Sequence, residues 1–175
     1  MIIEKTATIY NNMNRITKEF CSARSGFDYI IQQIGRKDVV YLLPAYVGLS
    51  PKEGSGIFDP IKKNDVSYKF YKLDNKLQID VDYLTNLIES ESSSKKIVLL
   101  IVHYFGFVDS RIEDIDAMAK SKGVTIIEDE AHALFTDYVD NRCGKYGAVS
   151  IFSLHKMLPY ETGGLVRDNY CTGFL

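Results

Sequence analysis

The feature that most constrains the fold is an uninterrupted apolar run at residues 97–102, with the sequence IVLLIV. Such a run has no polar face, so it predicts a strand that is buried on both sides. Residues 38–44 (DVVYLLP) and 124–127 (VTII) have a similar character. Strands of this kind are typical of parallel sheets, whose two faces are covered by helices.

Segments with helical periodicity separate these strands. One face of the first is formed by Phe27, Ile30, Ile31 and Ile34, with Ser25 as a suitable N-cap and Gly35 as a terminator. A second helix is expected after Asp80, and a third over residues 112–119, closed by Gly123. The alternation predicts an α/β fold of three layers, in which a mostly parallel sheet carries helices on both faces.

Bulk properties exclude several classes of protein. The chain has 175 residues, a formal net charge of -2 and 46% hydrophobic residues, which suits one globular domain. The absence of a basic block argues against nucleic acid as the main partner, and no apolar run is long enough to cross a membrane. Three scattered cysteines form no CxxC pair, so we expect no metal site and a reducing, cytoplasmic location.

The most informative polar residue is Lys156, which follows the strand-like residues 150–154 (SIFSL) and precedes Gly163 and Gly164. A lysine on a short loop after a buried strand is expected to be half-desolvated, which favours its neutral, nucleophilic amine. The alternative is a surface lysine in a hairpin. A second chemical group, Asp129, ends the strand of residues 124–127, and ligands of α/β sheets bind at such strand ends.

These two stretches resemble the active site of fold-type I pyridoxal-phosphate enzymes, and most closely the DegT family of sugar aminotransferases. That family has a Glu-Asp-x-Ala-Gln/His motif, matched here by residues 128–132 (EDEAH). Its Phe-Ser pair, lysine and Gly-Gly are matched by Phe152 and Ser153, Lys156, and residues 163–164. The spacing differs, since family members usually place the serine five residues before the lysine and have Gly-Glu before the glycines.

The resemblance implies roles for individual residues. Lys156 would form a Schiff base with pyridoxal 5'-phosphate and move the proton, and Asp129 would hold the proton of the cofactor's ring nitrogen. His132 would contact the ring or its hydroxyl, and Ser153 would donate to the phosphate. Ser25 and Gly26 match the start of the family's phosphate-binding helix, although Phe27 replaces its third, hydroxyl residue.

Two further residues stay open between a structural and a functional reading. Tyr46, in a turn like the family's Pro-x-Tyr, either packs or flanks the cofactor ring. His103, in a His-x-x-Gly segment, is either structural or in contact with cofactor or substrate. Three other motifs are rejected: the GSG triplet of residues 54–56 and the DEAH of residues 129–132 lack a Walker lysine loop, and the Ser153-x-x-Lys156 spacing lacks the other motifs of penicillin-binding proteins.

The implied function is amino transfer between an amino-acid donor and a keto-sugar-like acceptor, in a homodimer or larger homo-oligomer. Enzymes of this fold are roughly twice as long, so we expect residues 1–175 to form an incomplete, cofactor-binding large domain without its small C-terminal domain. This leads us to expect an oligomer with weak or absent cofactor and little or no turnover. The alternatives are a truncated, non-catalytic aminotransferase-like domain and a fold relative with lyase activity.

Overall fold

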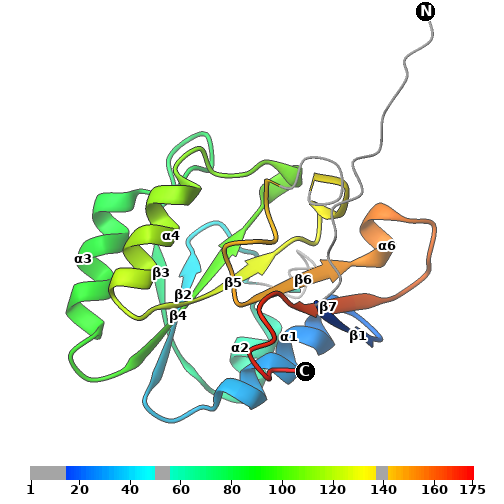
Figure 1. Cartoon of the computed structure of the whole chain (residues 1–175), viewed down its shortest axis with the longest axis horizontal. Helices are drawn as coiled ribbons and strands as arrows, with labels where there is room; N and C mark the ends of the chain where they lie inside the picture. Colours follow the sequence, from blue (N-terminus) through cyan, green and yellow to red (C-terminus); the bar gives the residue numbers. More distant parts are fainter. Residues whose placement is uncertain (1–14, 50–55, 137–141) are drawn as a thin grey trace, which may run out of the picture.

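A computed structural model of the protein describes residues 15–49, 56–136 and 142–175. It contains one seven-stranded sheet with the order β1-β7-β6-β5-β4-β2-β3 (Figure 1). The strands are β1 (Ile16–Phe20), β2 (Val39–Pro44), β3 (Ser67–Tyr71), β4 (Lys96–Val102), β5 (Thr125–Asp129), β6 (Val149–Ser153) and β7 (Gly164–Asp168). The adjacent strands β6, β5, β4, β2 and β3 all pair in parallel, and β7 is antiparallel to both β6 and β1. The predicted mostly parallel sheet is therefore confirmed.

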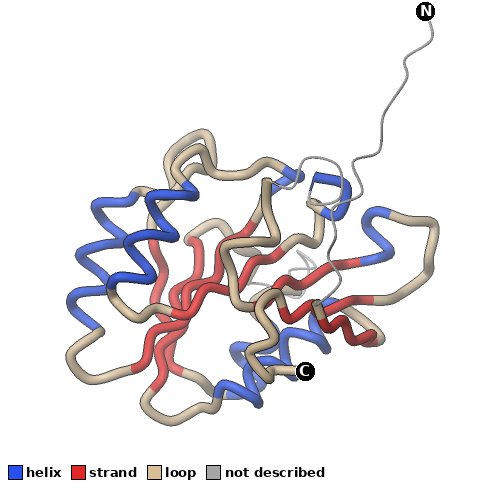
Figure 2. Tube along the Cα trace, in the orientation of Figure 1, coloured by secondary structure: helices blue, strands red, loops and turns tan. Residues whose placement is uncertain are grey.

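Helices cover both faces of this sheet, as the tube view in Figure 2 shows. On one face lie α1 (Ala23–Ile34) and α2 (Asp59–Asn64), and on the other α3 (Val81–Glu91) and α4 (Ile112–Ser121). Each face has its own apolar core, one that includes the α1 residues Phe27, Ile30 and Ile31 and one that includes Leu84 and Ile115. The three-layer α/β prediction is confirmed.

The central strand β4 shows why this arrangement is stable. Val98 and Leu100 belong to the core under α1, whereas Leu99 and Ile101 belong to the core under α3 and α4. All four side chains are at most 1% exposed. Since each fully buried aliphatic side chain contributes about 1.5–3 kcal/mol, the run of residues 97–102 is stable only where both faces are covered.

One local prediction needs correction, and one strand was not predicted. Helix α1 begins one turn earlier than expected, because its N-cap is Ser22, whose extended backbone lets its side chain accept the N–H of Ser25. Strand β1 was not predicted, because its residues are mostly exposed and show no apolar alternation. It forms by antiparallel pairing with β7, a partner that is distant in the sequence.

The strand order also shows where a ligand would bind. From β2 the chain continues to β3 on one side, and then returns to place β4 on the other side of β2. In open α/β sheets, ligands bind outside the carboxyl ends of the strands at this reversal. Asp129 and Ser153 end the next two strands, β5 and β6. Within the described ranges, no helix has the length and apolar character needed to span a membrane.

Candidate functional site

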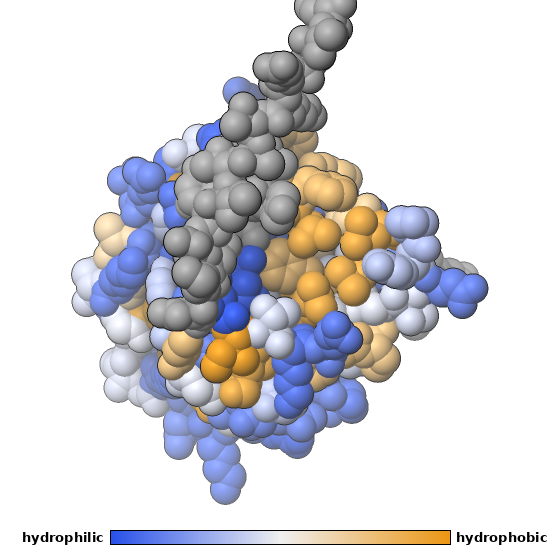
Figure 3. Space-filling model, turned by 45° about the vertical axis from the view of Figure 1, so that its right-hand side comes forward, coloured by the Kyte–Doolittle hydropathy of each residue, from blue (hydrophilic) through white to orange (hydrophobic). Residues whose placement is uncertain are grey.

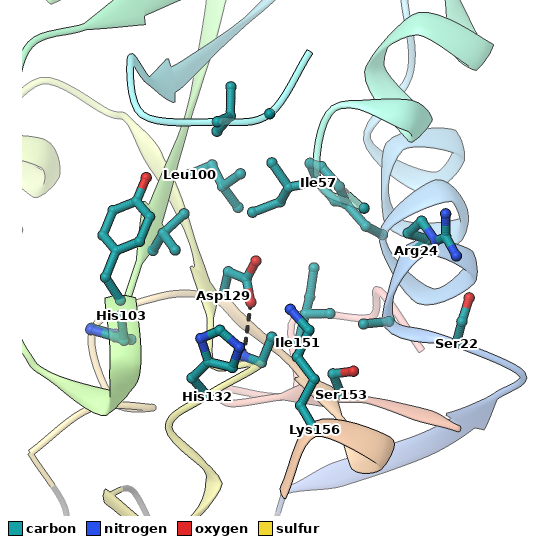
Figure 4. A pocket seen from close by; sticks show the side chains of 18 of the residues that line it. Ser22, Arg24, Ile57, Leu100, His103, Asp129, His132, Ile151, Ser153 and Lys156 are labelled. Atoms are coloured by element: carbon teal, nitrogen blue, oxygen red, sulfur yellow. Dashed lines mark hydrogen bonds between the residues drawn. The ribbon is translucent and has the colours of Figure 1, made fainter. Parts of the chain in front are cut away.

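A cleft of about 350 Å³ lies at the carboxyl ends of the parallel strands. The segments that line it are the start of α1, the turn after β2, the ends of β4 and β5, and the stretch from β6 into the short helix α6 (Leu154–Met157). Figure 4 shows Asp129, His132, Ser153 and Lys156 around this cavity. The structure thus brings together four of the six predicted site residues.

Asp129 lies at the floor of the cleft, at the last position of β5. Its Oδ1 accepts the backbone N–H of Ala131 at 2.8 Å, the dashed line in Figure 4, and its other oxygen points into the cavity. Burial raises the pKa of Asp129, although the Ala131 N–H and the positive charge of Lys156 oppose this rise. A carboxylate that protein surroundings destabilise in this way gains by pairing with a cation in the cleft.

His132 stands beside Asp129, and its ring is stacked on Phe105 with 6.0 Å between ring centroids and 13° between ring planes. Burial lowers the pKa of His132 and the charge of Lys156 lowers it further, while Asp129 acts in the opposite direction. The imidazole therefore lies nearly parallel to an aromatic ring and favours its neutral form, which can both donate and accept a hydrogen bond.

Lys156 lies on α6, a single helical turn directly after β6, and its amine points toward Asp129 in Figure 4. Two expectations for it are wrong, since the segment is a helical turn rather than a loop and the side chain is exposed rather than half-desolvated. The amine is accessible because β6 ends at the rim of the sheet, where α6 turns away from the core.

The start of α1 contributes Ser22, Ala23 and Arg24 to the cleft, whereas Ser25 and Gly26 do not line it. The Ser25 hydroxyl bonds the Ser22 hydroxyl at 2.9 Å. Gly26 is needed for packing, since a Cβ there would lie 2.5 Å from a methyl carbon of Val166. The predicted helix start therefore lies at the cleft, but the residues that line the cleft come one turn before Ser25 and Gly26.

Gly163 and Gly164 lie where two segments of backbone approach each other closely. A Cβ on Gly164 would lie 2.3 Å from both the backbone nitrogen of Ala23 and the carbonyl carbon of Ser22. Gly163 donates its N–H to Cys21 and accepts that of Leu154. This glycine pair thus lets the backbone before α1 approach the segment that carries Lys156, which brings the helix start and the lysine to one cleft.

Tyr46 and His103 both line the cleft, but in different ways. Tyr46 is 59% exposed and meets the ring of Tyr104 edge-on, with 5.5 Å between centroids. The His103 ring is buried, and its Nε2 lies 2.8 Å from Glu128, so this histidine has a structural partner. Sequence reasoning missed His155, whose Nδ1 lies 3.1 Å from the Ser153 hydroxyl; its position next to the lysine was the available signal.

Comparisons with known proteins identify a family to which this chain is similar. The DegT/DnrJ/EryC1/StrS aminotransferase family matches residues 65–169, more than half of the chain. A curated relative is UDP-4-amino-4,6-dideoxy-N-acetyl-beta-L-altrosamine transaminase from Campylobacter jejuni, 32% identical over 68 residues, which are 37% of this chain and 18% of the relative.

Solved structures have the same fold. A DegT DnrJ EryC1 StrS aminotransferase from Brucella abortus superposes with a TM-score of 0.68 at 20% identity, over 89% of this chain and 42% of that one. A structure described as SPT with PLP gives a TM-score of 0.69 at 15% identity, over 90% and 39%. The chain thus spans about two fifths of the length of these solved relatives.

Proposed function

The chain belongs to the DegT/DnrJ/EryC1/StrS aminotransferase family, and on this premise we propose that its cleft binds pyridoxal phosphate and supports amino transfer. The observation that carries the proposal is the convergence of Asp129, Lys156 and the start of α1 on one cleft. The donor would be an amino acid and the acceptor a keto sugar, since the Campylobacter relative is a transaminase of an amino sugar.

The residues present fit the cofactor's three chemical parts. The start of α1 offers backbone N–H groups and a helix dipole to the phosphate, with Ser153 nearby as a hydroxyl donor. Asp129 offers a carboxylate to the ring nitrogen, and His132 a neutral imidazole to the ring or its hydroxyl. Lys156 offers an exposed amine to the aldehyde. We keep Ser25 and Gly26 as supports of the helix start rather than as phosphate contacts.

The bound cofactor would draw electrons from the substrate carbon that carries the amino group, so that a proton can leave this carbon. Asp129 would keep the ring nitrogen protonated, because a neighbouring anion stabilises the cationic form. Lys156 would hold the cofactor covalently and then carry the proton from one carbon to the next. The stack of His132 on Phe105 would limit the movement of the imidazole beside the ring.

We also propose that the protein acts as a homo-oligomer in the cytoplasm. Five aromatic residues with exposed fractions of 50–74% support association: Tyr46, Phe105, Phe107, Phe135 and Tyr160. Two of them follow β4 and one follows β2, so part of this apolar surface lies next to the cleft. Figure 3 shows apolar surface gathered between polar regions on one side of the molecule. Contiguous exposed apolar surface is typical of interaction sites.

The direct test adds pyridoxal phosphate to the protein, reduces the mixture with borohydride, and maps the labelled peptide by mass spectrometry. The label is expected on Lys156, and Lys156→Ala should lose it while Lys145→Ala keeps it. Asp129→Asn should remain folded but retain the cofactor less well. Labelling at Lys145 or at several surface lysines would contradict the proposed site.

A second experiment separates the catalytic from the non-catalytic alternative. Glutamate and a nucleotide-linked keto sugar are incubated with the cofactor-loaded protein, and amino-sugar formation is followed by mass spectrometry. A product that depends on Lys156 supports amino transfer. Labelled Lys156 without product supports an aminotransferase-like domain that binds the cofactor but does not turn over, and a product of elimination instead supports lyase chemistry.

A further inference from the structure

A buried acidic residue next to Asp129 has no part in the chemistry described so far. Glu128 precedes Asp129 in β5, and successive strand residues point to opposite faces of a sheet. Asp129 therefore faces the cleft, whereas the Glu128 side chain is 0% exposed and lies in the protein interior. A carboxylate without solvent is costly unless several donors surround it.

Glu128 has four such donors. Its Oε1 accepts the backbone N–H groups of Tyr146 at 2.8 Å and Gly147 at 2.6 Å. Its Oε2 accepts the N–H of Gly144 at 2.8 Å and lies 2.8 Å from Nε2 of His103. Burial by itself raises the pKa of Glu128, but the bond to His103 and the backbone donors outweigh burial and hold the pKa below its usual value.

These bonds join the strand ends that form the cleft. Residues 144–147 lead into β6, which ends at Ser153 and is followed directly by α6 with Lys156. His103 follows β4, and its backbone N–H donates to the carbonyl of Asp129 at 3.0 Å. Gly147 comes so close to β5 that a Cβ there would lie 3.0 Å from the nitrogen of Glu128. A single carboxylate thus fixes the end of β4 and the entry to β6 against β5.

We propose that Glu128, on the side of the sheet opposite the cleft, and His103, at the edge of the cleft, are positioning residues, which set the placement of Asp129 relative to Lys156. This inference rests on the proposed function, in which Asp129 and Lys156 contact the same cofactor and must therefore be correctly placed relative to each other. His103 borders the cleft, but its side chain, like that of Glu128, is 0% exposed, so the role does not require either side chain to touch substrate or cofactor.

A double-mutant cycle tests this role without any cofactor. The rate at which a small acylating reagent modifies the exposed Lys156 is measured at fixed pH, by peptide mass spectrometry, in the parent, E128Q, D129N and the double variant. Because Glu128 would act through Asp129, E128Q should change the Lys156 rate at least about twofold in the parent and should not change it in the D129N background. Equal effects of E128Q in both backgrounds would overturn the proposal.

Three comparisons complete the test. E113Q makes the same chemical change at an exposed position of α4 and should leave the Lys156 rate unchanged. If E128Q does not fold, the cycle is run with H103A, and H103Q, which keeps a donor for Glu128, should restore most of the parent rate. If the cycle shows coupling but pyridoxal phosphate does not label Lys156, the proposed function fails while the positioning role stands.

Discussion

The substitution Gly164→Ala tests how the cleft is assembled. The added Cβ would lie 2.3 Å from two backbone atoms, the nitrogen of Ala23 and the carbonyl carbon of Ser22, and real Cβ contacts essentially never fall below 3.0 Å. The start of β7 must therefore move away from the start of α1. Overpacking of this kind costs typically 1–3 kcal/mol, and we expect about 3 kcal/mol because both sides are backbone and have no rotamer to adjust.

The assay is thermal or urea unfolding followed by circular dichroism, together with titration of pyridoxal phosphate. For a chain of this length, about 3 kcal/mol lowers the melting temperature by about 6–12 °C. The cofactor affinity should fall as well, because the helix start that faces the cleft is displaced. A lower melting temperature together with a lower cofactor affinity would show that the substitution disturbs the fold at the proposed phosphate site.

Gly123→Ala is the matched control. Gly123 has φ +65 and no heavy atom within 4 Å of an added Cβ, so its substitution introduces backbone strain of roughly 1–2 kcal/mol without a clash. It should leave pyridoxal phosphate affinity unchanged. If Gly164→Ala is no more destabilising than Gly123→Ala and binds the cofactor like the parent, the close approach of β7 and α1 is not what builds the cleft.

Three further predictions concern stability. Ser22→Ala should cost about 1 kcal/mol as the loss of a helix cap, and Ser25→Ala clearly less; the reverse order in urea unfolding would contradict the corrected start of α1. Leu99→Ala should lower the free energy of unfolding by about 2–5 kcal/mol, measured in the same way, because it leaves a cavity in a strand buried on both faces. Asp168 is buried, which by itself raises its pKa, but bonds from Thr172, Tyr170 and Gly173 outweigh this and hold the pKa below the usual value of 3.8. The ionised Asp168 therefore stabilises the fold fully above this unfolded-state pKa, and this stabilisation is lost as the pH falls through the lower folded-state pKa. Below about pH 4, acid should lower the free energy of unfolding more in the parent than in Asp168→Asn. Parallel plots of this free energy against pH for the two proteins would refute the prediction.

The sequence by itself determined the layered fold. The run of residues 97–102 has no polar side, so it required cover on both faces, and the helix of Phe27, Ile30 and Ile31 supplied an apolar stripe to cover it. Both signals are local, because they depend on the period of a strand or a helix. Asp129 and Lys156 could be found for a similar reason: each directly follows or ends an apolar strand, and parallel strands end at the same edge of a sheet.

Where two nearby residues have similar chemistry, only the tertiary structure decided which of them has which structural or functional role. Ser22 and Ser25 are equally good caps in the sequence, and the approach of Gly164 to the chain at Ser22 selects the first as the start of α1. Strand β1 exists only as a partner of β7, since its own residues bury little. Glu128 and Asp129 are adjacent carboxylates of similar chemistry. Glu128 is buried and bonded to His103, whereas Asp129 faces the cleft, because the pleat of β5 points their side chains to opposite sides of the sheet. The groups that surround each side chain come from segments far away in the sequence, so only the tertiary structure distinguishes the two carboxylates.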